Sequence, residues 1–201
     1  MLPFSHVGLT LGAAWLIKGG LARGQMKSVN PVEGHDELKP TCRLNLAKSI
    51  DYRVVMVGAL LPDIIDKPVG DVIFRDYFGQ GRIFCHTLLF LIILTTIGIY
   101  LYKTRRKLWL LLLAFGTFTH LILDFMWLEP RILLWPTYGI TFPREESTTF
   151  GNWIIDMWNA LKADPVICAP EVIGAIILVV FFAVLIRRRK FYAFIRYGVT
   201  S

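Results

Sequence analysis

Two carboxylates break an otherwise apolar stretch in the first third of the chain. Residues 58–68 read GALLPDIIDKP, so Asp63 and Asp66 directly follow a run of apolar side chains. Aspartate can bind a divalent cation, but it is also a common helix cap, and Asp66 could pair with Lys67 next to it. Pro62 is expected to end or restart the helix here, because proline removes a backbone donor. The local sequence leaves a metal-binding role and a capping role open.

A second pair lies in the apolar stretch HLILDFMWL. His120 and Asp124 are four residues apart, so they share one face of a helix about one turn from each other. The HxxxD spacing alone is also compatible with a structural hydrogen bond. An ionisable side chain inside a membrane segment, however, is energetically costly, and such residues usually have a functional role. We therefore favour a functional role for this pair.

The other histidines carry less information on their own. His86 lies in CHTLLF and His6 lies near the start of the chain, and either could be an ordinary interfacial residue. His35 falls in the polar stretch NPVEGHDELKP and is expected to be solvated. Cys85 would point about 100° away from His86 around a helix, so we do not expect it to be a ligand.

Together these side chains form a plausible donor set for a metal. Imidazoles and carboxylates suit a borderline divalent ion, so zinc is favoured, with manganese and iron as alternatives. One ion with an open position, or two ions bridged by a carboxylate, would fit such a set. Asp63 and Asp66 are the candidate catalytic residues, one of them as a general base or as an orienting residue. The candidate ligands are His6, Asp63, Asp66, His86, His120 and Asp124.

The composition indicates what must position these residues. The chain has 201 residues, of which 55% are hydrophobic, and a mean hydropathy of +0.54. These values predict an all-α integral membrane protein, and the length suits a single domain over residues 1–201. The net charge of +7 is carried by short basic clusters beside apolar runs, which is a topology signal and gives no reason to expect a nucleic-acid partner.

About five transmembrane helices are expected, each needing about 20 apolar residues. Three candidates are strong and two are weaker. The strong candidates are residues 83–102, 108–128 and 170–186, and the weaker ones are residues 4–17 and 47–66. His86 would then lie three residues into the third helix.

The distribution of charge predicts the orientation. Residues 18–53 hold seven Lys/Arg against four Asp/Glu, whereas residues 129–171 hold three against six. Residues 103–107 and 187–196 add four and five basic side chains. Because cytoplasmic loops are rich in Lys and Arg, the amino terminus is predicted outside and the carboxyl terminus inside the inner membrane. All six candidate ligands then lie at the outer face, and Asp63 should point into the bundle toward His86, His120 and Asp124.

The order of these motifs resembles a known family. GALLPDIIDKP, GRIFCHTLLF and HLILDFMW, followed by LLWPTYGITFP, are similar to the LexA-regulated, inner-membrane-associated metal-dependent hydrolases, from His6 to about Pro143. The resemblance implies a multi-helix membrane protein with a His/Asp metal site and hydrolase activity. It implies site roles for Asp63, Asp66, His86, His120 and Asp124, and more loosely for His6. Relatives have Pro-Asp-x-Asp where this chain has Pro-Asp-x-x-Asp, which leaves the role of Asp66 open.

The segment before the last span suggests where a substrate would approach. Residues 127–161 are rich in aromatic side chains, and the apolar positions within 148–162 predict a short amphipathic helix at the outer interface. A lipid-like or membrane-proximal ester, phosphoester or amide would be a suitable substrate, with the lipid bilayer as the partner. Arg82 could clamp an anionic group, although a snorkelling interfacial arginine is the simpler interpretation. A metal transporter and a non-catalytic structural or stress-response membrane protein are the alternative functions.

Overall fold

The described part of the chain is helical. The computed structural model describes residues 3–27, 50–143, 158–159 and 165–198, and no β-strand occurs in these ranges. The long helices are α1 (Pro3–Lys27), α2 (Tyr52–Lys67), α4 (Leu88–Arg105), α5 (Trp109–Leu123) and α8 (Pro165–Arg187). The short ones are the π-helix η2 (Pro68–Ile73), α3 (Arg75–Phe78), the 3-10 helix η3 (Met126–Leu128), α6 (Pro130–Leu133) and α9 (Phe191–Tyr197).

The five long helices occupy the five segments predicted as spans, but they are not equally suited to cross a membrane. Within the described residues, only Leu88–Arg105 and Cys168–Arg187 are both long and apolar enough for a span, and Trp109–Leu123 is apolar but shorter. Helices α1 and α2 do not meet this test. The helical class is confirmed, whereas length and composition support two spans and not the predicted five.

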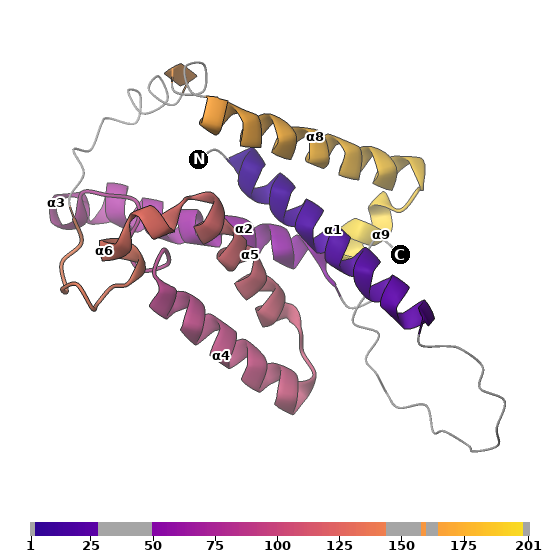
Figure 1. Ribbon diagram of the computed structural model, residues 1–201, viewed down its shortest axis with the longest axis horizontal. Helices are drawn as coiled ribbons and strands as arrows, with labels where there is room; N and C mark the ends of the chain where they lie inside the picture. Colours follow the sequence, from indigo (N-terminus) through magenta and orange to yellow (C-terminus); the bar gives the residue numbers. More distant parts are fainter. Residues whose placement is uncertain (1–2, 28–49, 144–157, 160–164, 199–201) are drawn as a thin grey trace.

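Close backbone contacts organise the bundle (Figure 1). Helix α1 lies along α8, and α2 lies along α5, which also contacts α4. The two main contacts use glycine pairs: a Cβ on Gly8 would overlap Gly174, and a Cβ on Gly116 would come within 2.6 Å of the Ala59 nitrogen. Small residues let helix backbones approach closely, which is a common way of packing helices in membranes.

The expectation that Pro62 ends or restarts the helix is wrong. Helix α2 runs through Pro62 to Lys67 and continues directly into η2. Proline leaves the carbonyl of Gly58, four residues earlier, without its usual helical donor. The hydroxyl of Thr117 on α5 lies 3.3 Å from that carbonyl and 3.1 Å from the carbonyl of Leu113 in its own helix, so its single proton is shared between the two acceptors. This shared contact between helices partly compensates for the lost hydrogen bond where α2 continues through Pro62.

The position predicted for His86 inside a helix is also wrong. Helix α4 begins at Leu88, after Thr87, whose extended backbone and side-chain oxygen cap the helix by accepting from the Phe90 N–H at 3.1 Å. Residues 79–87 therefore form a loop that leads into α4. His86 lies on this loop, where its backbone N–H is free of helical hydrogen bonding.

The far end of α2 is joined to the end of the described chain. The backbone N–H of Tyr52 donates to the carbonyl of Gly198 at 2.9 Å, and Arg53 donates to the carbonyl of Ile195 at 2.6 Å. Helix α9 is thereby held against the start of α2. The amphipathic helix predicted within 148–162 lies outside the described residues, apart from Trp158 and Asn159, which are helical.

Candidate metal centre

The six predicted site residues gather at one end of α2. They come from α1, from the last two turns of α2, from the loop before α4 and from the end of α5. Among the described residues, two groups have ligand atoms within 4.8 Å of one another: His6, His120 and Asp124, and Asp63, His86 and His120. The predicted convergence is thus present, with His120 common to both groups and Asp66 in neither.

Asp66 holds His86 in place. Its buried carboxylate accepts from the backbone N–H groups of Ile83, Cys85 and His86 at 2.9–3.1 Å. It also lies 2.7 Å from Nδ1 of His86. A carboxylate is an acceptor, so Nδ1 carries the proton and Nε2 presents a lone pair. Asp66 therefore orients a candidate ligand, and this favours the orienting alternative that the sequence left open.

His120 is fixed in the same way by a different acceptor. Its Nδ1 lies 2.7 Å from the carbonyl oxygen of Ala59 on α2, and the ring is fully buried. A carbonyl oxygen only accepts, so Nδ1–H is again the donor and Nε2 has the lone pair. The close contact between α2 and α5 at Gly58 and Gly116 brings this carbonyl within reach.

The two lone pairs face each other. Nε2 of His86 and Nε2 of His120 are 3.3 Å apart. Oδ1 of Asp63 lies 3.6 Å from the first and 3.8 Å from the second. Asp63 therefore points into the bundle toward both histidines, as predicted. Three acceptors that converge without a donor between them repel one another unless a cation or a proton lies among them.

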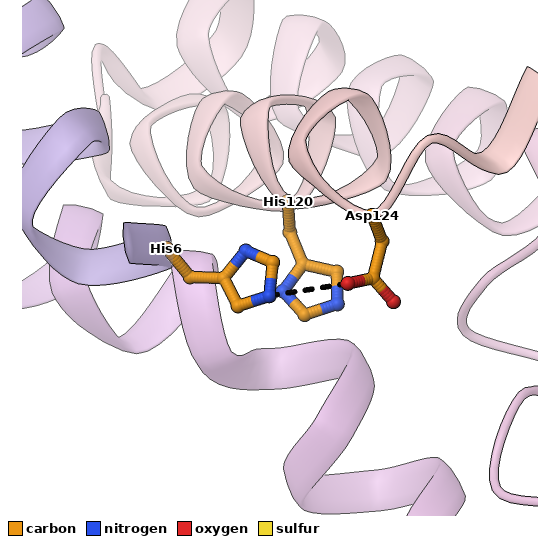
Figure 2. A group of neighbouring side chains, drawn as sticks. All are labelled: His6, His120 and Asp124. Carbon is orange, nitrogen blue, oxygen red and sulfur yellow. Dashed lines mark ion pairs between the residues drawn. The ribbon is translucent and has the colours of Figure 1, made fainter. Parts of the chain in front are cut away.

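His6 and Asp124 lie beside His120, which belongs to this trio (Figure 2). The ring of His6 stacks on that of His120 with centroids 4.1 Å apart. Nε2 of His6 is 3.2 Å from Oδ1 of Asp124. That pair does not have hydrogen-bond alignment, and neither ring nitrogen of the buried His6 has a hydrogen-bond partner among the described residues. A buried imidazole in this condition is a candidate ligand.

Helix α8 helps to place His6, a contribution that the sequence did not reveal. Glu171 on α8 is buried and accepts from the hydroxyl of Ser5 at 2.6 Å and from its backbone N–H at 3.1 Å. The hydroxyls of Thr10 and Thr119 are 2.8 Å apart and join α1 to α5. These hydrogen bonds fix α1 on both sides next to His6.

Two cations border the cluster on its carboxylates. Nζ of Lys67 lies 2.8 Å from Oδ2 of Asp63, and Nε of Arg82 lies 3.1 Å from Oδ2 of Asp124. In each carboxylate, the other oxygen faces a histidine. The sequence suggested only a neighbour pair of Asp66 with Lys67, whereas the helical spacing of four residues pairs Lys67 with Asp63.

Aromatic side chains cover the loop that carries His86. Trp135 and Phe142 stack with centroids 5.5 Å apart, and both contact Phe84 edge to face. Phe78 packs against Phe84 and Phe142 from the other side. Part of the predicted aromatic segment therefore packs on the loop. The side chain of Asp63 is still 17% exposed.

The donor set fits a divalent metal ion. Ligand atoms at about 2.0–2.2 Å from one ion lie about 3–4 Å from each other. The distances of 3.3–3.8 Å among His86, His120 and Asp63 lie within this range. The Nδ1 hydrogen bonds to a carboxylate and a carbonyl are those that metal-binding histidines usually make. Cys85 is in neither group of the described residues.

Comparison with known proteins identifies the family of the chain. Neither a curated protein nor a solved structure matches it. The family described as YdjM inner membrane protein matches residues 1–197, which agrees with the apolar helices α4 and α8 and with the inner-membrane part of the resemblance. Hydrolase activity and regulation by LexA stay predictions. The chain belongs to the YdjM inner membrane protein family.

Proposed function

We propose that this protein is a membrane-bound, metal-dependent hydrolase that acts on an ester, phosphoester or amide at the outer face of the inner membrane. The observation that carries the proposal is the pair of Nε2 atoms of His86 and His120, 3.3 Å apart, with Oδ1 of Asp63 beside them. Zinc is the favoured ion, because two imidazoles and a carboxylate leave a fourth position open, as in catalytic zinc sites.

The chain's own residues would divide the work. His86, His120 and Asp63 would hold the ion, and His6 and Asp124 supply a further imidazole and carboxylate next to them. When bound, such an ion provides Lewis acidity and an activated water.

Two further groups would keep the histidines in their binding tautomer: Asp66 for His86 and the carbonyl of Ala59 for His120. Of the two candidate catalytic carboxylates, Asp63 would be a ligand through Oδ1 while its Oδ2 accepts from Lys67, and Asp66 has the orienting role because loop N–H groups occupy it.

The proposed topology has five membrane-crossing helices, with the amino terminus outside and the carboxyl terminus inside. Arg105 ends α4 and Arg187 ends α8, so the basic side chains lie at the ends of these helices that the Lys/Arg bias assigns to the cytoplasm. In a cysteine-free background, a cysteine at Arg105 should react with an impermeant reagent only from the cytoplasmic side, and one at Glu146 only from outside. Labelling of both positions from one side would exclude this arrangement.

Metal analysis is the primary test. Purified protein from cells supplied with zinc, manganese and iron should contain one or two divalent ions per chain. Protein that stays metal-free under all three conditions would refute the metal site. Turnover of p-nitrophenyl acetate or bis(p-nitrophenyl) phosphate in detergent then separates a hydrolase from a protein that uses its metal only for stability.

A further inference from the structure

We propose that Arg82 binds the phosphate of the substrate, so that the reaction is hydrolysis of a phosphate ester. This inference rests on the proposed function and narrows it from three bond types to one. Arg82 lies on the loop before α4, four residues before His86. Its Nε donates to Oδ2 of Asp124 at 3.1 Å. The same oxygen lies 4.0 Å from Nε2 of His86, so a single carboxylate separates the guanidinium from the histidine pair.

The guanidinium of Arg82 has hydrogen-bond donors that are not used within the described part of the chain. Among the contacts that the structure records for Arg82, only Nε has a partner, and neither Nη1 nor Nη2 is paired with a described residue. The side chain is 35% exposed, whereas that of Asp124 is 4% exposed. A snorkelling arginine would direct its charged group toward water and away from the cluster. Here Asp124 fixes Nε beside the cluster, and the N–H groups of Nη1 and Nη2 are available to an anionic ligand.

The charges around the cluster favour an anionic substrate. With neutral histidines, a divalent ion and the carboxylates of Asp63, Asp66 and Asp124 would leave a formal charge of minus one. Lys67 and Arg82, each paired with one of these carboxylates, change it to plus one. A neutral ester or amide would not need the positive charges of Lys67 and Arg82 in order to bind. Without these two charges, an anionic phosphate ester would be repelled by the net negative charge of the site.

Phosphate suits the geometry of arginine. The planar fork binds two oxygens of one phosphate at once, which the point charge of a lysine cannot do. The phosphate would then lie beside the Asp124 carboxylate, within reach of both the histidine pair and Arg82. In the reaction, the oxygen of water bonds to phosphorus, the P–O bond to the alcohol breaks, and the leaving oxygen takes one proton from that water. The products are a phosphate with one ester bond fewer and an alcohol.

The variants Arg82→Lys and Arg82→Gln test this inference by binding. Metal-loaded protein is titrated with inorganic phosphate in a calorimeter, which measures the phosphate affinity. This affinity should be about 10- to 100-fold lower in both variants than in wild type, since a charge-assisted hydrogen bond is lost. Arg131→Gln, an exposed arginine on α6, is the matched control and should bind as wild type does. Metal content is measured in parallel, because Arg82 also contacts Asp124. Equal phosphate affinity in wild type and Arg82→Gln at equal metal content would overturn the inference.

Turnover provides the second readout. For bis(p-nitrophenyl) phosphate, kcat/KM should fall about 10- to 100-fold in Arg82→Gln, with little change for p-nitrophenyl acetate. An equal fall for both substrates would assign Arg82 a structural role and overturn the proposal. Wild-type protein that holds metal and binds phosphate but cleaves neither compound would refute the hydrolase function while supporting the anion site. Protein that cleaves the acetate but neither binds nor cleaves phosphate would refute only the present inference.

The source of the phosphate is decided by a comparison of substrates. Short-chain phosphatidylglycerol in detergent micelles presents the phosphate at a membrane-like surface, and bis(p-nitrophenyl) phosphate presents it in solution. Loss of activity toward either one in Arg82→Gln supports the phosphate site. Preference for the lipid would assign a headgroup, and preference for the soluble compound a free phosphate ester. Release of fatty acid from the lipid, without phosphate ester cleavage, would overturn the proposal.

Discussion

The two ends of α2 carry the same kind of group in different surroundings. At the start, the carboxylate of Asp51 accepts from the Arg53 guanidinium at 2.8 Å and 3.1 Å, and both side chains are partly exposed. At the other end, Oδ1 of Asp63 faces the Nε2 lone pairs of His86 and His120, which are fully buried. At the Asp51 end the carboxylate has a cationic partner from the chain itself, Arg53. At the Asp63 end the carboxylate oxygen faces two other hydrogen-bond acceptors.

The two ends of α2 show how a structural charge can be distinguished from a functional one. An exposed ion pair contributes little to stability, since water solvates either partner after the other is lost. Buried acceptors that face one another are costly unless a cation joins them. Changes at the Asp63 end should therefore alter cation binding, whereas changes at the Asp51 end should not.

The largest effect is expected from His120→Ala, which removes the residue common to both candidate groups. Metal affinity should fall by more than about 100-fold, because loss of a ligand exceeds the 10–100-fold effect typical of its supporting residues. Inductively coupled plasma mass spectrometry of purified protein measures the bound metal. Asp51→Asn is the control and should keep the wild-type content. A normal metal content in His120→Ala would remove the distinction between the two ends.

Metal removal should destabilise the wild-type protein next most strongly. A ligand present at 100 times its Kd contributes about 2.7 kcal/mol to folding, and the ion would join α2, the loop before α4, and α5 at one point. A chelator should therefore lower the Tm of the wild-type protein in detergent. The same treatment should leave His120→Ala unchanged, and an equal shift in both proteins would count against a site at this position.

Asp66→Asn should weaken metal binding by about 10- to 100-fold without abolishing it. The asparagine keeps the size of the side chain, but it loses the charge that holds Nδ1–H of His86. Competition with a fluorescent chelator gives the affinity. Asp76→Asn, on α3 near the same end, is the control. Complete loss of metal would instead make Asp66 a direct ligand.

Thr117→Val should cost about 1 kcal/mol of stability. The change removes the donor for the Gly58 carbonyl that Pro62 leaves without a helical partner, while keeping the shape of the side chain. Thr104→Val is a matched control, because Thr104 makes an equivalent bond to a carbonyl within its own helix at an exposed position. Thermal unfolding in detergent should distinguish the two, and equal values would contradict the compensating role of Thr117.

The smallest effect belongs to the Asp51 end. Arg53→Gln removes the partner of an exposed carboxylate and one hydrogen bond to the Ile195 carbonyl. Its Tm should change less than that of Thr117→Val, and its metal affinity should equal that of wild type. A loss of metal in this variant would mean that the two ends of α2 are coupled.

The sequence predicted the long helices and the gathering of the six polar residues, because both follow from local pattern and charge bias. It did not predict the loop conformation of His86, because the acceptor of the loop N–H groups, Asp66, lies far away in sequence. Nor did it predict that α2 continues through Pro62, because the compensating hydroxyl belongs to α5. Both features depend on contacts between segments that are separate in the sequence, and the periodicity of apolar residues within one segment does not predict such contacts.

The position of His6 at the start of α1 has a consequence for the timing of assembly. Synthesis proceeds from the amino terminus at about 5–20 residues per second, so His120 follows His6 by about 6–23 s. During that interval His6 has left the ribosome while the imidazole on which it stacks has not been made. Glu171, which holds α1 through Ser5, is made later still. Under the proposed function, His120 could join an ion only after α5 has been made, and His6 could take its place beside His120 only after α8 has packed on α1.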